Sequence, residues 1–193
     1  MEVFSHSLPK VQTYVNFLAT VGVERGLIGP REVPRLWERH ILNSAVVLPR
    51  VPVGATVADV GTGAGLPGLV WAIARTDLSV TLIEPLLRRT VFLDEMREAL
   101  DLDNVRVIRA RADEVNEEFD VVTARAVAGL GKLARWCMPL VRNGGVLLAL
   151  KGQTAQHEVD ASTRTLTKLG ATTIVVNTYG DLAVPTTVVE ATK

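Results

Sequence analysis

One glycine-rich segment of the sequence has the residue types and spacing expected of a ligand-binding loop. It reads DVGTGAGLPG from Asp59 to Gly68, and it lies between a short β-branched run and a helix-like run. Glycines permit a positive φ and let the backbone approach a ligand closely, and the N-terminus of the following helix offers unpaired N–H groups. The four glycines in the eight residues from Gly61 to Gly68 exceed what a tight turn needs. The segment therefore predicts a turn on which a nucleotide-like ligand lies.

The segment fits two binding patterns, DxGxGxG beginning at Asp59 and the dinucleotide pattern GxGxxG from Gly63 to Gly68. Asp59, still on the strand, can hold the loop and orient a cationic amino-acid moiety, such as the methionine end of S-adenosylmethionine (AdoMet). Pro67 suits the first turn of a helix, where its missing N–H has no cost. Glu84 ends the next strand, where a carboxylate can accept hydrogen bonds from both ribose hydroxyls, a feature that serves NAD equally well. The first pattern is favoured, and the alternative is a turn without a ligand beside a surface Glu84.

A third candidate follows the third predicted strand, at Ala112-Asp113-Glu114. A side chain and a backbone N–H at this place can meet an adenine ring. A solvated acidic loop fits the spacing equally well, so both interpretations stay open.

Two basic residues follow later strands, Arg125 after the fourth and Lys151 after the fifth. Active-site positions of open α/β sheets lie beyond the carboxyl ends of the strands. Arg125 can donate two hydrogen bonds to guanine O6 and N7 or bind phosphate, although a donor on N7 must be released before N7 attacks. A surface ion pair is its alternative. Lys151 fits a phosphate contact and an ordinary solvated lysine equally well.

The segment after the fourth strand also restricts the nucleophile of a methyl transfer. It reads VTARAV from Val122 to Val127, without the Asn/Asp-Pro-Pro-aromatic loop that usually accompanies methylation of an exocyclic base amine. Guanine N7 carries a lone pair in the ring plane and has no proton to remove. A guanine N7 acceptor would therefore need no general base, and none is obvious here.

From Ala55 onward, β-branched runs alternate with helix-like segments, which is typical of βαβ units around a parallel sheet. The predicted strands are Thr56–Val60, Val80–Glu84, Val105–Arg109, Phe119–Thr123, Val146–Leu150, Thr173–Asn177 and Thr186–Glu190. The predicted helices are Leu69–Arg75, Arg88–Leu100, Leu130–Val141 and Ala155–Leu169. We expect an α/β fold of the class I AdoMet-dependent (Rossmann-like) methyltransferases, with a seven-stranded, mostly parallel sheet and helices on both faces.

Residues 1–50 read as an N-terminal helical extension to the AdoMet-binding domain of residues 51–193, within a single-domain protein. Prolines and glycines interrupt these helices. Arg39 and His40 can face the cofactor pocket and contact RNA phosphate, with Arg35 one turn earlier. Packing or capping is the alternative for His40.

The composition excludes several classes of protein. Lys plus Arg and Asp plus Glu both total 21, so an RNA site must be a local patch. Cys137 is the single cysteine, and no His/Cys cluster has zinc spacing, so neither a disulfide nor a metal is expected. The sequence shows neither a signal peptide nor an apolar run of about 20 residues. We expect a cytoplasmic monomer that does not associate with membranes.

The sequence resembles the RsmG family, also called glucose-inhibited division protein B, along most of the chain. The shared motifs are Arg39-His40-Ile41-Leu42-Asn43-Ser44, the loop from Asp59 to Gly68, Arg88-Arg89-Thr90-Val91-Phe92-Leu93, Arg125-Ala126 and Leu150-Lys151-Gly152-Gln153. The family's Asn-Leu-Thr stretch is absent upstream, where residues 25–30 read RGLIGP.

The resemblance implies methylation of guanine N7 in bacterial 16S ribosomal RNA near the decoding centre, with the small ribosomal subunit as partner. It also implies a cofactor site that includes Gly61, Leu66, Glu84, Ala112, Asp113 and Arg125. Asp59, Thr62 and Gly63 complete the predicted AdoMet site. Arg125 is the predicted catalytic residue, and Arg39, His40 and Lys151 are the predicted RNA contacts.

Three other functions compete with this interpretation. A nicotinamide-dependent oxidoreductase fits the GxGxxG pattern, but neither Tyr14 nor Tyr179 is followed by a lysine at the spacing of a Tyr-x-x-x-Lys pair. A non-catalytic RNA-binding module is disfavoured by the near-zero net charge. A methyltransferase acting on another RNA, a protein or a small molecule is opposed by the family resemblance alone.

Overall fold

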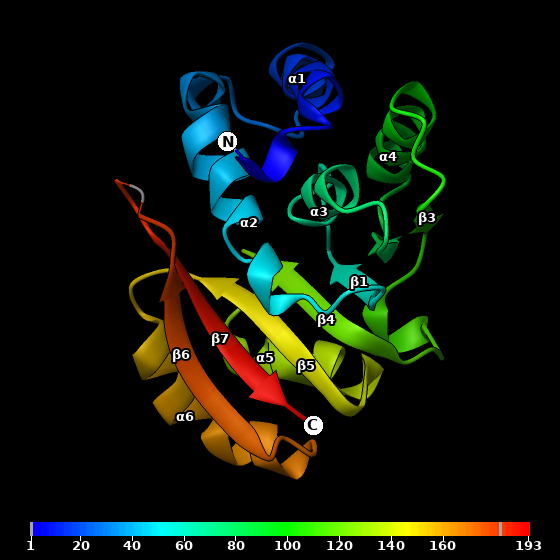
Figure 1. Cartoon of the computed structure of the whole chain (residues 1–193). Helices are drawn as coiled ribbons and strands as arrows, with labels where there is room; N and C mark the ends of the chain where they lie inside the picture. Colours follow the sequence, from blue (N-terminus) through cyan, green and yellow to red (C-terminus); the bar gives the residue numbers. More distant parts are fainter. Residues whose placement is uncertain (1, 182) are drawn as a thin grey trace.

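A seven-stranded sheet with the order β3-β2-β1-β4-β5-β7-β6 lies at the centre of the computed structural model (Figure 1), which describes residues 2–181 and 183–193. Its strands are β1 (Thr56–Val60), β2 (Ser79–Ile83), β3 (Val105–Ile108), β4 (Phe119–Arg125), β5 (Val141–Lys151), β6 (Thr173–Tyr179) and β7 (Thr186–Thr192). Strands β1 to β5 pair in parallel, and β7 runs antiparallel to β5 and β6. The predicted mostly parallel sheet is confirmed. Its order reverses between β1 and β4, where α/β sheets form a ligand crevice.

Helices cover both faces of this sheet. They are α3 (Gly68–Ala74), α4 (Leu87–Ala99), α5 (Leu130–Cys137) and α6 (Ala155–Lys168), with short 3-10 helices η6 (Ala112–Glu114) and η7 (Met138–Leu140). Figure 1 shows α3 and α4 on one face and α5 and α6 on the other. Because side chains alternate along a strand, Val57 and Val121 join the core under α3, whereas Ala58 and Val122 join the core under α5. The two layers of helices therefore cover two separate cores.

The start of β5 differs from the prediction. The helix predicted to reach Val141 ends at Cys137, and β5 begins at Val141 instead of Val146. The Gly144 N–H donates to the Lys193 carbonyl at 2.8 Å, and the Lys193 N–H donates to Gly145 at 3.0 Å. The C-terminal residue thus supplies the partners of a segment whose Asn-Gly-Gly sequence resembles a turn.

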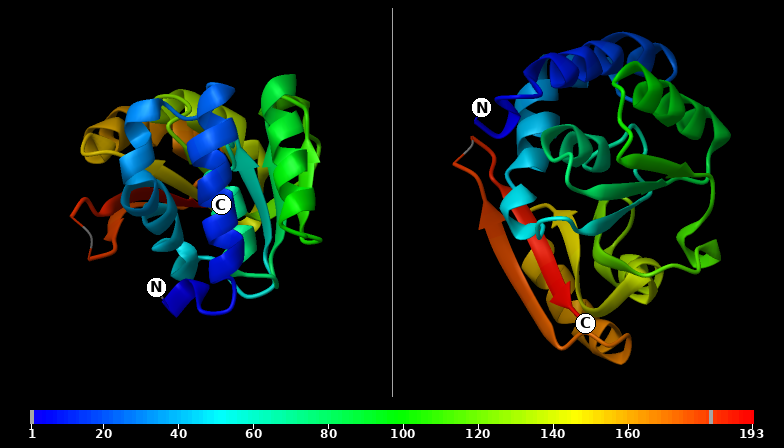
Figure 2. Two further views of the ribbon diagram at one scale, coloured as in Figure 1. Left: turned by 90° about the horizontal axis from the view of Figure 1, so that it is seen from above. Right: turned by 45° about the vertical axis from the view of Figure 1, so that its right-hand side comes forward.

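Residues 2–50 form short helices on the α3 and α4 side, and Figure 2 shows them beside these two helices. They are η1 (Glu2–Phe4), α1 (Leu8–Phe17), the π-helix η2 (Leu18–Gly22), η3 (Pro30–Arg35), the π-helix η4 (Leu36–Leu42), α2 (Asn43–Ala45) and η5 (Leu48–Arg50). We call residues 2–50 the N-terminal segment. It lies on the face of the sheet that α3 covers and reaches the carboxyl end of β4, where His40 contacts Arg125.

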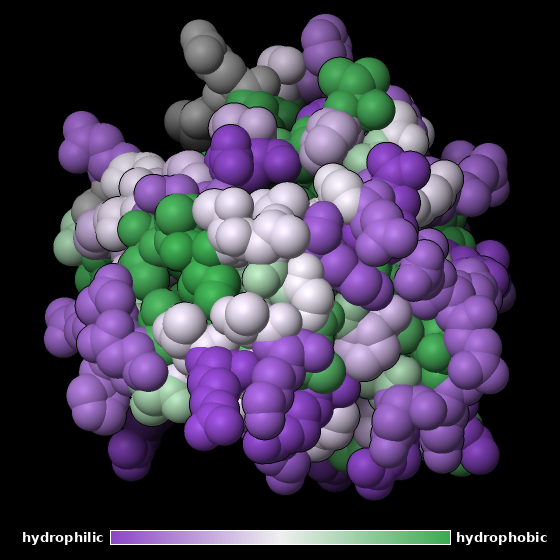
Figure 3. Space-filling model, turned by 90° about the horizontal axis from the view of Figure 1, so that it is seen from below, coloured by the Kyte–Doolittle hydropathy of each residue, from purple (hydrophilic) through white to green (hydrophobic). Residues whose placement is uncertain are grey.

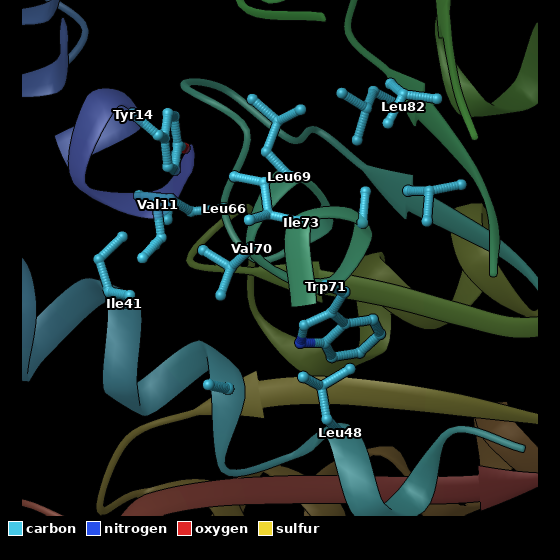
Figure 4. Packing of buried hydrophobic residues seen from close by; sticks show 14 of the residues in the cluster. Val11, Tyr14, Ile41, Leu48, Leu66, Leu69, Val70, Trp71, Ile73 and Leu82 are labelled. Carbon is cyan, nitrogen blue, oxygen red and sulfur yellow. The ribbon is translucent and has the colours of Figure 1, made fainter. Parts of the chain in front are cut away.

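The N-terminal segment shares its core with the sheet. Figure 4 shows Val11 and Tyr14 of α1 and Ile41 of η4 in one cluster with Leu66 and Trp71, all of them buried. The Tyr14 hydroxyl donates to the Ala64 carbonyl of the glycine loop at 2.7 Å, and the Trp71 indole N–H donates to the Ser44 carbonyl at 2.8 Å. The segment therefore packs directly against the loop and α3.

The surface is mixed in character. On the face seen from below, hydrophilic and hydrophobic side chains lie side by side and neither kind covers it (Figure 3). None of the helices in the described part of the chain has both the length and the apolar character that a bilayer crossing requires.

Candidate active site

The glycine loop between β1 and α3 has a conformation that needs its glycines. Gly61, Gly63 and Gly65 have φ values of 65°, 62° and 99°. A Cβ atom at Gly61 would lie 3.0 Å from Val127 Cγ2, and one at Gly65 would lie 2.4 Å from Leu69 Cδ1. Side chains are excluded at both places, because the backbone is left-handed and neighbouring atoms fill the space.

Asp59 holds this loop from beneath. Its Oδ2 accepts hydrogen bonds from the Thr62 hydroxyl at 2.6 Å and the Gly68 N–H at 2.8 Å, which ties both ends of the loop to β1. Burial raises the pKa of Asp59 to about 6 against the lowering effect of these two hydrogen bonds. Its other oxygen, Oδ1, is buried without a partner in the described residues. Asp59 therefore holds the loop, as the sequence predicts. Its contact with a cationic part of a ligand stays a prediction.

A cavity of about 670 Å³ lies against the loop, within the range of roughly 300–1,000 Å³ that is usual for small-molecule sites. We call it the first cavity. Its wall contains all the predicted cofactor contacts except Asp59, namely Gly61, Thr62, Gly63, Leu66, Glu84, Ala112, Asp113 and Arg125. The fold thus brings together residues from the ends of β1, β2, β3 and β4.

Glu84 lies in this wall with 1% of its surface exposed, so the alternative of a surface glutamate is wrong. Its Oε2 accepts from the Gly63 N–H at 3.1 Å and from Arg89 Nη1 at 3.3 Å, and its Oε1 accepts from the Leu86 N–H at 3.1 Å. These bonds use three of the roughly four acceptor positions of a carboxylate. Contacts to two ribose hydroxyls therefore require one protein donor to leave, and Arg89 forms the longest of the three bonds.

Ala112 and Asp113 lie on η6 at the rim of the first cavity. Ala112 is buried, whereas the Asp113 side chain is exposed and accepts a hydrogen bond from Arg111 Nε at 3.0 Å. This bond to Arg111 holds the pKa of Asp113 below its usual range. The Asp113 carboxylate is thus solvated and also lines the first cavity, and its contact with an adenine ring stays a prediction.

Arg125 ends β4 on the face that the N-terminal segment covers, because side-chain alternation places it on the same side as Val121. It is half-buried, and its Nη2 donates to His40 Nδ1 at 3.0 Å, which differs from the surface ion pair considered as an alternative. Burial lowers the pKa of its guanidinium from the usual value. The next residue, Ala126, has a φ of 53°, a backbone conformation that is uncommon outside glycine.

A second cavity of about 1070 Å³ adjoins the first. Arg125 and Ala126 line both cavities, and we call this shared wall the junction. The second cavity is lined by all three predicted RNA contacts, by one further arginine, and by residues of the loop between β6 and β7: Arg35, Arg39, His40, Lys151, Val184 and Pro185. The structure thus places these predicted contacts in one cavity beside the predicted catalytic residue.

Lys151 differs from a free surface lysine. Its Nζ donates to the Ala128 carbonyl and to Glu158 Oε2, both at 2.7 Å, and 8% of its side chain is exposed. Alternation along β5 places Lys151 on the face covered by α6, which carries Glu158. The alternative of an ordinary solvated lysine is wrong. Contact between Lys151 and an RNA phosphate stays a prediction. The Lys151 ammonium group already has the Glu158 carboxylate as its partner.

His40 connects Arg125 to Glu32 on η3. The His40 Nε2 atom lies 2.8 Å from Glu32 Oε2, and the other Glu32 oxygen accepts from Arg39 Nη1 at 3.2 Å. The hydrogen bond with His40 lowers the pKa of Glu32. Burial and the charge of Arg125 lower the pKa of His40, against the raising effect of Glu32.

Several cavity residues were not predicted from the sequence. Trp136 on α5, Arg89 on α4 and Leu27 line the first cavity, and Glu32 contacts His40 of the second cavity. Arg89 follows Glu84 by five residues, a local signal that its contact with this carboxylate could have used. Trp136 and Leu27 have no local signal, because only the folded chain brings them to the loop.

The described residues include no group of three or more His, Cys, Asp and Glu side chains that could hold a metal ion. The site consists instead of one cavity built on backbone amides and a carboxylate, and a second lined by basic side chains together with the acidic Glu38, Glu158 and Asp181. Such a pair of cavities can hold a nucleotide-like cofactor beside a second, anionic molecule.

Comparison with known proteins identifies relatives along nearly the whole chain. A sequence model of the family described as rRNA small subunit methyltransferase G matches residues 7–183. The ribosomal RNA small subunit methyltransferase G of Thermobifida fusca is 61% identical over 169 residues, which cover 86% of this chain and 71% of that protein. The protein of the same name from Corynebacterium glutamicum (strain R) is 52% identical over 195 residues, which cover 97% of this chain and 87% of that protein.

The fold also matches a solved structure, a SAM-dependent O-methyltransferase from Thermotoga maritima. The TM-score is 0.61 at 15% sequence identity, over 83% of this chain and 69% of that one. This likeness confirms the predicted class I methyltransferase fold.

Proposed function

Because the chain belongs to the rRNA small subunit methyltransferase G family, we propose that it methylates N7 of a guanine in 16S ribosomal RNA, near the decoding centre of the small subunit, with AdoMet as methyl donor. The observation that carries the proposal is the junction, where a nucleotide-type cavity adjoins at Arg125 a second cavity whose wall includes four arginine and lysine side chains and three acidic ones. We propose further that the enzyme acts as a monomer in the cytoplasm.

The residues of the first cavity fit AdoMet. Glu84 offers acceptors for a ribose, and Arg89 Nε is a buried donor without a partner in the described residues. The backbone of the glycine loop can approach the ligand closely, because Gly61 and Gly63 have no side chain. When bound, AdoMet supplies an electrophilic methyl group on a sulfonium.

The residues of the chain have mainly to orient the acceptor, since holding two reactants in line supplies much of the rate enhancement of such a transfer. The Arg125 guanidinium can donate hydrogen bonds to guanine O6 at the junction. Guanine N7 has no proton to remove, so no side chain needs to act as a base. Arg35 and Arg39 in the second cavity can pair with RNA phosphates.

The test is methyl transfer from labelled AdoMet to undermethylated small subunits, with N7-methylguanine detected by aniline cleavage of the RNA. Wild-type protein is expected to place the label in guanine, and Arg125→Ala to lose it. Arg164→Ala, which removes an exposed arginine of α6, is the matched control and is expected to retain activity. Label in adenine, or in protein alone, would contradict the proposal.

A further inference from the structure

We propose that Glu32 and His40 position Arg125 for methyl transfer, by holding its guanidinium at the junction through the neutral His40 ring. The inference rests on the proposed function, and it assigns roles to two residues that do not line the cofactor cavity. His40 is in this account a positioning residue, because it acts through Arg125.

The contacts form a continuous chain across three elements. Glu32 on η3 lies 2.8 Å from His40 Nε2 on η4, and His40 Nδ1 lies 3.0 Å from Arg125 Nη2 at the end of β4. The His40 side chain is 13% exposed and that of Glu32 is 28% exposed, so the chain runs from the surface to the junction. No other side-chain hydrogen bond of the Arg125 guanidinium is present among residues 2–181 and 183–193.

The protonation state of His40 follows from these partners. A guanidinium has only donors, so His40 Nδ1 must accept the hydrogen bond from Arg125. The ring proton then lies on Nε2, and this N–H donates a hydrogen bond to Glu32. A second ring proton would place a donor on Nδ1 against the Arg125 donor, and two cations would face each other. Protonation of His40 therefore releases Arg125 from its place.

The charges around His40 come from every element packed against it. Glu32 on η3 raises its pKa, whereas Arg125 on β4 and Arg39 on η4, together with burial, lower it. The wall of the second cavity adds Arg35, Glu38, Lys151, Glu158 and Asp181. The lowering effects dominate, and the ring is neutral at neutral pH.

The first experiment compares two substitutions of His40 at pH 8, where the ring is neutral. In His40→Asn the side-chain oxygen takes the place of Nδ1 and can still accept from Arg125. In His40→Gln the amide takes the place of Nε2 and the acceptor for Arg125 is lost. We expect kcat to fall about 10- to 100-fold in His40→Gln, as misplacement of a catalytic group does, and to fall clearly less in His40→Asn, which keeps the acceptor for Arg125 but loses the contact with Glu32.

His157→Gln on the exposed side of α6 is the matched control, with wild-type activity. Thermal unfolding establishes that each variant is folded. Folded His40→Gln with the wild-type kcat would overturn the inference, as would an equal loss in both His40 variants, which indicates a merely structural role.

The second experiment is the pH profile of kcat, in which the rate is expected to fall on acidification as His40 takes up a proton. Glu32→Gln removes the charge that raises the pKa of His40, so this fall is expected to move to lower pH. Asp59 also titrates near 6, but Glu32 is not among the groups that shift its pKa. Glu95→Gln, which breaks the exposed ion pair with Arg25, is the control and leaves the profile unchanged. An unchanged profile in Glu32→Gln would overturn the inference.

The failures of the two proposals are distinguishable. Absence of methyl transfer by the wild-type protein overturns the proposed function, and the inference with it. Methyl transfer by the wild type, with equal rates in His40→Gln, overturns the inference alone. NMR titration of His40 needs no substrate, and Arg125→Met is expected to raise the pKa of the ring.

Discussion

The two cavities that meet at the junction are built in different ways. The first is bounded by a loop whose backbone is fixed by buried groups: Asp59 beneath it, Glu84 beside it and Tyr14 behind it. The second is lined by long charged side chains from the N-terminal segment and by the loop between β6 and β7. A fixed backbone suits a small cofactor of one shape, whereas charged side chains on a broad surface suit a large polyanion.

The largest expected effect comes from a methyl group added to the glycine loop that bounds the first cavity. Gly65→Ala forces a left-handed φ of 99° on alanine and places its Cβ 2.4 Å from Leu69 Cδ1. Strain and overpacking together should lower the free energy of unfolding by about 2–4 kcal/mol, measured in urea. Gly152→Ala in the second cavity is the matched control, because its Cβ meets nothing within 4 Å. Equal stability of the two variants would contradict the difference between the cavities.

Glu84→Gln should have the next largest effect. The substitution removes the negative charge from the acceptors proposed for the ribose, and hydrogen bonds to charged groups contribute about 1.5–3 kcal/mol. AdoMet affinity is therefore expected to fall about 10- to 100-fold in isothermal titration calorimetry. Glu95→Gln on the exposed side of α4 controls for the loss of a carboxylate. Unchanged affinity in Glu84→Gln would place the cofactor elsewhere.

Tyr14→Phe tests whether the N-terminal segment fixes the loop. The variant keeps the buried ring but removes the 2.7 Å hydrogen bond to the Ala64 carbonyl, which then lacks this buried donor. A loss of about 1–2 kcal/mol in the free energy of unfolding is expected. Tyr179→Phe, in which the hydroxyl lies beside Glu190 on the β6–β7 side, should leave AdoMet affinity unchanged, whereas Tyr14→Phe should lower it. The same affinity in both variants would show that the loop holds its shape without α1.

The smallest expected effect is the pH dependence of stability due to Asp59. Its folded-state pKa of about 6 lies above the ordinary value of 3.8, so the folded protein binds this proton more tightly than the unfolded chain. The resulting stability is fully present below pH 3.8 and is lost as the pH rises through about 6. Relative to Asp59→Asn, the wild type should therefore be about 1 kcal/mol more stable at a pH of about 5 than at about 7.5.

Asp77→Asn is the matched control for this pH dependence. Arg75 holds the pKa of Asp77 below its usual range. The stability that the Asp77 carboxylate contributes is therefore lost only at pH values below 3.8, outside the range in which Asp59 titrates. A difference between wild type and Asp59→Asn that is equal at both pH values would contradict the raised pKa of Asp59.

The sequence was sufficient to predict the parts of the site that depend on neighbours in the chain. The glycine loop follows β1 directly and Glu84 follows β2, so strand ends and residue types locate both. Phe92, Met96 and Val91 of α4 recur at helical spacing, which is typical of one apolar face. The first two are buried, but Val91 is 43% exposed, because spacing does not define the width of the face that packs.

Contacts between distant segments could not be predicted. Arg125 meets His40 across 85 positions of the chain, and Lys193 pairs with Gly144, which extends β5 beyond its predicted start. The partner of Lys151 depends on which face of β5 it occupies and on which helix covers that face. The tertiary fold thus brings the two cavities together at the junction. The sequence alone predicts that Arg125 lies at a strand end, but not which residues surround it.

A crystal structure of the protein with AdoMet tests the central claim most directly. We expect the ribose at Glu84, the cofactor along the glycine loop in the first cavity, and its methyl group directed at the junction beside Arg125. A cofactor bound in the second cavity, or one whose methyl group points away from Arg125, would contradict the account.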